Sequence, residues 1–215
     1  MRSWSNPRTL VCHRAKPSVM FSPLAWLKLQ FFCHAGQTEV GGFGISSQRN
    51  PLYIDDFVTV PQHASLFSVR FLDDAVADFF DRCVDFGLAP QQFGRIWCHT
   101  HPGASVKPSN VDEETFASCF GHCDWSLMFI LGRTGRTYAR LAFPAGPGGR
   151  VQLQAAVDWA SWPRYLVAES TSMSPLIEAW QHEYASHVQV APAPTPIANP
   201  KAHGLEDAAN CFPAK

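Results

Sequence analysis

Two long stretches in the first half of the chain carry the closely spaced apolar residues of buried helices. The first covers residues 22–35 and opens with Ser22-Pro23, a helix cap followed by proline at the first helical position. The second begins at Asp73-Asp74 and runs to about residue 87, with acidic residues that suit the dipole of a first helical turn. Shorter apolar runs predict strands at 38–45, 52–60 and 66–71.

The second half of the chain alternates short apolar runs with helical stretches. The runs predict strands at 94–99, 125–131, 137–143 and 151–156. Helical spacing of apolar residues is found at 112–120 and at 174–188. Strands and helices mixed in this order predict an α+β domain built around a curved sheet.

Changes in composition divide the chain into four parts. Residues 1–20 read as an irregular N-terminal arm, and residues 21–156 hold all of the predicted strands. Residues 157–190 form a C-terminal helical extension, and residues 191–215 are a proline-rich tail that we expect to be disordered. With 215 residues, of which 46% are hydrophobic, the chain is long enough to bury one full core.

Charge and hydropathy exclude two classes of partner. The formal net charge is -1 and the basic residues are scattered, so nothing favours binding to nucleic acid. No run reaches the roughly 18 apolar residues that a membrane-spanning helix needs, and the first residues are too polar for the core of a signal peptide. We therefore expect a cytoplasmic protein with neither nucleic acid nor membrane as a partner.

The cysteines do not indicate a disulfide framework. There are 7, an odd number, and they are spread along the chain without a CxxC pair. Most are expected to be small buried hydrophobic residues. One group, Cys119, His122 and Cys123, has the residue types of a second, structural zinc site, but no fourth ligand is evident.

The strongest chemical signal is a pair of histidines followed by an aspartate. His99 and His101 come at the end of a predicted strand, where alternate side chains share one face. A loop rich in proline and glycine leads to Asp112 at the start of a predicted helix. Two imidazole nitrogens and one carboxylate oxygen, with a fourth position open, form the ligand set of a catalytic zinc ion. The spacing predicts one Zn²⁺ per chain.

Two further residues fit a hydrolytic reaction. Glu39 opens a glycine-rich strand and can take a proton from water, although a solvated carboxylate at a strand edge is the alternative. Ser109 can donate a hydrogen bond to a developing oxyanion, or it is merely a loop or helix-cap residue. Glycines in a strand suggest close approach of another backbone or a ligand, so the candidate substrate-binding residues are Gly41, Gly42 and Gly44.

These residues together resemble the JAMM motif of the JAB/MPN-domain zinc metallopeptidases, and of their prokaryotic branch in particular. Glu39 precedes Val40-Gly41-Gly42, and the later part of the motif reads His99-x-His101-Pro102-x6-Ser109-x2-Asp112. The resemblance spans roughly residues 20 to 155. It implies the cytidine-deaminase-like MPN/JAB fold, a curved mixed β-sheet flanked by helices. It also implies that His99, His101 and Asp112 bind zinc, that Glu39 is the acid and base, and that Ser109 stabilises the tetrahedral intermediate.

The same resemblance implies a function. Members of the family hydrolyse isopeptide or peptide bonds after the C-terminus of ubiquitin or ubiquitin-like proteins. The expected partners are therefore a ubiquitin-like protein, its conjugates, and the activating and conjugating enzymes of a bacterial system. Two alternatives are a non-catalytic MPN scaffold and a peptidase that processes small peptides or sulfur-carrier proteins. An added substrate strand would pair beside the active groove, where the glycines leave room.

Overall fold

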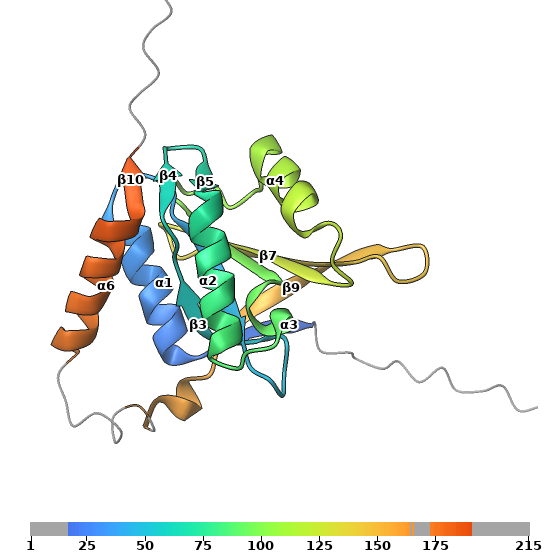
Figure 1. Ribbon diagram of the computed structural model, residues 1–215, viewed down its shortest axis with the longest axis horizontal. Helices are drawn as coiled ribbons and strands as arrows, with labels where there is room; N and C mark the ends of the chain where they lie inside the picture. Colours follow the sequence, from blue (N-terminus) through green and yellow to red (C-terminus); the bar gives the residue numbers. More distant parts are fainter. Residues whose placement is uncertain (1–16, 164, 166–172, 191–215) are drawn as a thin grey trace, which may run out of the picture.

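A sheet of strands forms the centre of the fold, and helices lie against it (Figure 1). The computed structural model describes residues 17–163, 165 and 173–190. Its strands are β1 (Ser18–Phe21), β2 (Gly41–Ser46), β3 (Tyr53–Val58), β4 (Gln62–Ala64), β5 (Val69–Phe71), β6 (Ile96–His101), β7 (Ser126–Gly132), β8 (Thr137–Phe143), β9 (Gly149–Val157) and β10 (Val188–Val190). Its helices are α1 (Pro23–Ala35), α2 (Asp73–Asp85), α3 (Pro90–Phe93), α4 (Asn110–Phe120), the 3-10 helix η1 (Trp159–Ser161) and α6 (Ser174–His187).

Seven of the strands close into a barrel with the order β1-β3-β2-β6-β7-β8-β9. The closure depends on β1, which pairs in parallel with β3 through Met20 and Tyr53, and with β9 through Val19 and Ala155. Val19 and Phe21 of β1 are fully buried. This short strand therefore satisfies both edges that an open sheet would leave unpaired.

The expected curved mixed sheet of the MPN/JAB kind is therefore wrong, because the strands form a closed barrel. The prediction of an α+β class is confirmed. The missing element was β1, of which residues 18–20 lie at the end of the stretch interpreted as an irregular arm. Residues 1–16 of that arm and the predicted tail at 191–215 lie outside the described residues.

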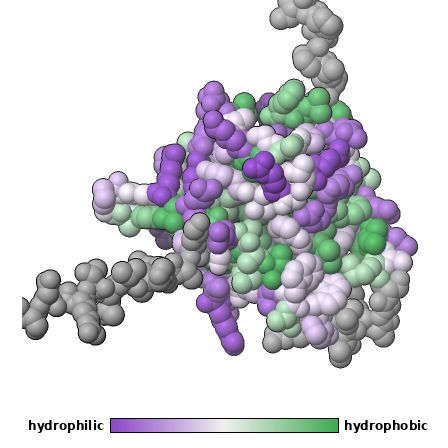
Figure 2. All heavy atoms as spheres, turned by 180° about the vertical axis from the view of Figure 1, so that it is seen from behind, coloured by the Kyte–Doolittle hydropathy of each residue, from purple (hydrophilic) through white to green (hydrophobic). Residues whose placement is uncertain are grey.

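The predicted helices are confirmed at 22–35, 73–87, 112–120 and 174–188, with small shifts of their ends. At the start of α1, the Ser22 side chain accepts a hydrogen bond from the Ala25 N–H and Pro23 occupies the first turn, as the sequence predicts. None of the helices in the described ranges is both long and apolar enough to cross a membrane. Seen from behind, the surface mixes hydrophilic and hydrophobic residues (Figure 2).

Strand β6 lies between two apolar clusters. Ile96 and Cys98 belong to a cluster with α1, while Trp97 belongs to a second cluster with α2 and α4. Because side chains alternate along a strand, His99 and His101 lie on the face of Trp97. The indole of Trp97 stacks on the His99 ring, with ring centroids 4.2 Å apart. The fold thus presents both histidines to the side covered by α4.

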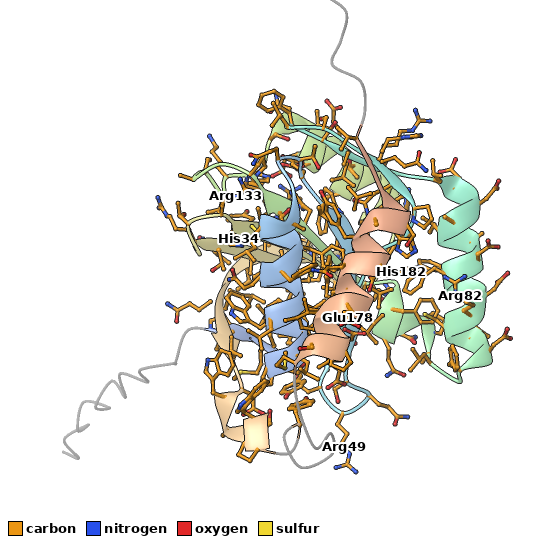
Figure 3. The ribbon with its side chains drawn as sticks, turned by 90° about the vertical axis from the view of Figure 1, so that its left-hand side faces the viewer. His34, Arg49, Arg82, Arg133, Glu178 and His182 are labelled. Atoms are coloured by element: carbon orange, nitrogen blue, oxygen red, sulfur yellow. The ribbon has the colours of Figure 1, made fainter. Side chains whose placement is uncertain are left out.

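A second, three-stranded sheet has the order β10-β4-β5. β10 follows directly on α6 and pairs in parallel with β4, so the C-terminal part of the described chain is attached to the hairpin of β4 and β5. α6 lies beside α1, as Figures 1 and 3 both show. Gln62 of β4 bonds to the backbone of Gly41 in both directions, at 2.8 and 2.9 Å. The small sheet is thereby joined to β2, next to the histidines.

Candidate metal centre

The two histidines lie at the carboxyl end of a strand that is paired on both sides. β6 pairs with β2 and with β7, and His99 lies opposite Gly41 and Ile130. His99 and His101 are both buried, and their ring centroids are 5.1 Å apart. Hydrogen bonds to two neighbouring strands therefore hold the backbone that carries both imidazoles.

Asp112 reaches the same point from the first turn of α4. The Asp112 N–H donates to Ser109 Oγ at 3.1 Å, and the Asp112 carboxylate accepts from the Ser109 N–H at 2.7 Å. This reciprocal capping box fixes the start of the helix. Asp112 Oδ1 lies 3.4 Å from His99 Nε2, and Oδ2 lies 3.5 Å from His101 Nε2.

The three side chains fit a metal ion. Their ligand atoms lie within 4.8 Å of one another, and His99 Nε2 and His101 Nε2 have no hydrogen-bond partner among the described residues. His101 Nδ1 donates to the Ser105 carbonyl at 2.9 Å, so Nε2 carries the lone pair when the ring is neutral. Two imidazole nitrogens and one carboxylate oxygen suit Zn²⁺ and other divalent transition metals. The buried group could hold such an ion.

Burial and close contact determine the charge of this group. Burial lowers the pKa of His99, which favours the neutral, metal-binding form. Burial alone would raise the pKa of Asp112, but the nearby imidazoles of His101 and His99 hold that pKa well below its usual range. Burial also acts to lower the pKa of His101, yet Asp112 and Glu39 outweigh it and the pKa is raised. A metal ion therefore competes with a proton for His101.

Glu39 approaches the group from the residues that precede β2. Its N–H donates to the Ser65 carbonyl at 2.8 Å. Its carboxylate Oε1 lies 3.7 Å from His101 Nε2, and Oε2 is buried without a hydrogen-bond partner in the described ranges. Burial raises the pKa of Glu39 to about 8. A carboxyl group with this pKa can take up and release a proton near neutral pH, as a general base must.

Ser109 lies at the rim of the same site and caps α4. Its hydroxyl oxygen accepts the hydrogen bond from Asp112 N–H, so the helix-cap interpretation holds. The hydroxyl hydrogen is not used by that bond. The side chain is exposed and lines a cleft together with Glu39 and His101. Capping and donation to a substrate oxygen are therefore compatible.

The cleft beside the metal group has a volume of about 430 Å³. Besides the motif residues, it is lined by Leu66 and Phe67, which are 52% and 76% exposed and lie in the turn between β4 and β5. Gln37 forms another part of the wall and accepts a hydrogen bond from Arg133, which lies beside the end of α1 (Figure 3). Leu66 and Phe67 were expected in a strand at 66–71, without a role in the site, whereas the observed strand β5 begins at Val69. The signal for this turn was an apolar pair between two serines.

Gly41, Gly42 and Gly44, the predicted substrate contacts, are surrounded by the protein's own atoms. The space beside Gly41 is filled by Val69 and Phe71, and the other two glycines face the protein's own atoms as well. β2 pairs with β6 through residues 41–43 and with β3 through residues 43–46, and the Gln62 side chain binds the backbone N–H and C=O of Gly41. These glycines allow close packing within the protein, so an added substrate strand has no free edge at β2.

The described residues contain no second metal group. Cys119 and Cys123 are free thiols, and His99, His101 and Asp112 are the only residues there whose ligand atoms come together. A larger cavity, of about 530 Å³, is lined by Trp97, Phe43 and parts of α2 and α4, but by none of the motif residues. Glu39, His101 and Ser109 therefore line the smaller cleft and not the larger cavity.

No protein-family model matches this chain, and a search of curated proteins finds no match either. The likeness to the JAB/MPN peptidases therefore depends on the motif residues alone. What the structure adds is their proximity: residues that are up to 73 positions apart, from Glu39 to Asp112, surround one buried point.

Proposed function

We propose that this chain is a zinc-dependent hydrolase that cleaves the amide bond after the C-terminus of a ubiquitin-like protein. The observation that carries the proposal is the buried group of His99, His101 and Asp112 with the carboxyl group of Glu39 beside it. The substrate class comes from the motif resemblance, which also suggests a bacterial conjugation system as the setting.

The metal ligands, Glu39 and Ser109 each have a separate role in the proposed reaction. A zinc ion held by His99, His101 and Asp112 would supply Lewis acidity to a carbonyl oxygen and lower the pKa of a water molecule. Glu39 accepts a proton from the attacking water and then gives it to the leaving amine nitrogen. Ser109 donates its hydroxyl hydrogen to the carbonyl oxygen as negative charge develops there.

The cleft favours a polypeptide substrate over a free amino acid. Its lining residues include no lysine or arginine. A substrate with a free carboxylate next to the scissile bond would therefore find no cation, whereas an internal amide or isopeptide needs none. This weighs against the release of a single amino acid from a sulfur-carrier adduct. The complete ligand set and the adjacent base weigh against a non-catalytic scaffold.

We still propose that the substrate tail adds as a strand to a sheet. The sheet is the small one, β10-β4-β5, and not the barrel. In the described part of the chain, β5 and β10 are the edge strands of the small sheet, and each pairs only with β4. β5 follows the turn that lines the cleft. An extended C-terminal tail can reach the metal group along β5 without opening the barrel.

Zinc content and hydrolysis test the proposal together. Purified wild-type protein is expected to hold one zinc per chain and to cleave a ubiquitin-like protein from a C-terminal fusion, but not to cleave a short dipeptide. His99→Ala is expected to lose both zinc and cleavage. Wild-type protein without stoichiometric zinc refutes the metal centre. Zinc without cleavage of any fusion favours the scaffold, and cleavage of the dipeptide alone favours the small-peptide enzyme.

A further inference from the structure

A partly buried ion pair attaches the helix that carries Asp112 to strand β8. Arg140 Nη1 and Nη2 donate to Glu113 Oε1 and Oε2 at 2.6 and 2.8 Å, which is a bidentate arrangement. Arg140 is only 7% exposed, and its guanidinium lies 5.3 Å from the centre of the Phe116 ring. The two charged residues are 27 positions apart, and the sequence pattern gave no sign of the contact.

Helix α4 depends on such contacts for its orientation. It has 11 residues, and an isolated helix of that length is marginal in water. Phe116 and Phe120 anchor its middle and its end in the second apolar cluster. The loop that leads to it, residues 102–109, contains no buried residue. The first turn, where Asp112 lies, is therefore attached to the barrel chiefly through Glu113.

The strand that carries Arg140 is part of the same wall as the histidines. Arg140 lies opposite Met128 on β7, and Met128 lies opposite Trp97 on β6. Trp97 in turn stacks on the His99 ring. One row across three paired strands thus links the guanidinium to a candidate metal ligand. The ion pair attaches the first turn of α4, which carries Asp112, to the same row.

We propose that Arg140 is a positioning residue for the metal centre. Through Glu113 it determines where the Asp112 carboxylate lies relative to His99 and His101, and thereby sets the affinity for the metal ion. The inference rests on the proposed metal centre and deepens it. Arg140 itself contacts no ligand atom, so its effect passes through the backbone between positions 113 and 112.

Zinc affinity, measured by competition with a chelator, tests this role without any need for hydrolysis. Arg140→Met is expected to weaken zinc binding about 10-fold, the lower end of the range for residues that support metal ligands. Arg140→Lys keeps the charge but loses the bidentate geometry, and an intermediate loss is expected. Lys28→Met is the matched control, because Lys28 is also 7% exposed and pairs with Glu183 in a different buried ion pair. Its zinc affinity should equal that of wild type.

Hydrogen exchange in chelator-treated protein supplies a second readout that needs no metal. The amides of Asp112 and Glu113 bond to Ser109, and both are expected to exchange faster in Arg140→Met than in wild type or Lys28→Met. Unchanged exchange together with unchanged zinc affinity overturns the positioning role and leaves the proposed hydrolase intact. A wild-type protein without hydrolytic activity refutes the proposed function and leaves both of these measurements valid.

Discussion

Two polar clusters in this protein, one partly and one largely buried, differ in how completely their atoms are partnered. The first, here called the helix cluster, consists of Lys28, Thr59, Glu183 and His187 and joins α1 to α6. Lys28 Nζ lies 2.8 Å from Glu183 Oε2, while Glu183 Oε1 accepts hydrogen bonds from the backbone and the hydroxyl of Thr59. Thr59 Oγ1 in turn accepts from His187 Nδ1 at 2.9 Å. No atom of these four residues is buried without a partner.

The second cluster is the metal group with Glu39, and it leaves several atoms unpartnered. Both ring nitrogens of His99, Nε2 of His101 and Oε2 of Glu39 are buried without a hydrogen-bond partner among the described residues. An unpartnered buried polar atom costs roughly 1–3 kcal/mol, so most proteins contain few of them. The helix cluster uses its charges to hold two helices together, whereas the metal group keeps its atoms available for a ligand.

The largest expected effect comes from changing the base alone. Glu39→Gln keeps the shape of the side chain but cannot accept a proton, so hydrolysis should fall about 10³-fold. Zinc content should stay at one per chain, because Glu39 is not a member of the metal group. The measurement is kcat/KM on a cleavable fusion together with metal analysis. Full activity in Glu39→Gln contradicts the mechanism, and loss of zinc makes Glu39 a ligand.

Breaking the helix cluster should change stability and leave the metal centre intact. Lys28→Met leaves the Glu183 carboxylate without its cation, and removing one partner of a buried pair typically costs about 3 kcal/mol or more. The free energy of unfolding in urea gives this value. Adding Glu183→Met should restore part of the loss, because no unpaired charge then remains. A loss below about 0.5 kcal/mol would place the pair among weak surface ion pairs.

The pH dependence of the free energy of unfolding distinguishes the two clusters and needs no assay of hydrolysis. Burial raises the pKa of Glu39 from 4.5 to about 8, so the folded protein holds a proton there that the unfolded chain releases. Stability is therefore lost as pH rises between these values. From about pH 5.5 to about pH 7.5, chelator-treated wild type should lose roughly 2–3 kcal/mol more than Glu39→Gln.

The comparison with Glu39→Gln is necessary because His101 changes stability in the same direction. Its pKa is raised in the folded protein, so its contribution is present at low pH and is lost as pH rises through the folded value. Equal slopes in wild type and Glu39→Gln would show that Glu39 is ionised throughout this range.

The local pattern of the sequence predicts most elements but not the closure of the barrel. α1, α2 and α6 follow from apolar spacing, with a serine cap for α1 and acidic residues in the first turn of α2, since these signals are local in the sequence. β1 and β10 have four and three residues, which is too few for a periodic signal. They are defined by pairing with strands far along the chain, β1 with β9 and β10 with β4. Barrel closure is a property of non-local pairing, between β1 and β9 above all.

The same distinction applies to the site. The ligands His99, His101 and Asp112 lie within 14 residues, so strand alternation and a helix start are enough to bring them together. Glu39 came from the motif, because no local rule relates it to a strand sixty residues away. Arg140 and Phe67 could not be found at all, since their roles depend on contacts that only the folded chain creates.

The smallest expected effect concerns the exposed turn at the cleft. Phe67 is 76% exposed and lines the cleft beside Glu39 and Ser109, so it can contact a substrate before the bond is cleaved. An apolar contact of this kind binds the ground state and the transition state equally, and its loss raises KM with little change in kcat. Phe67→Ala should raise KM about 10-fold, which corresponds to about 1.4 kcal/mol. Phe86→Ala is the control, because Phe86 is 83% exposed at the end of α2 and lines neither the cleft nor the larger cavity. An equal KM in both variants would exclude the turn from substrate binding, and a fall in kcat alone would assign Phe67 to the arrangement of the metal group.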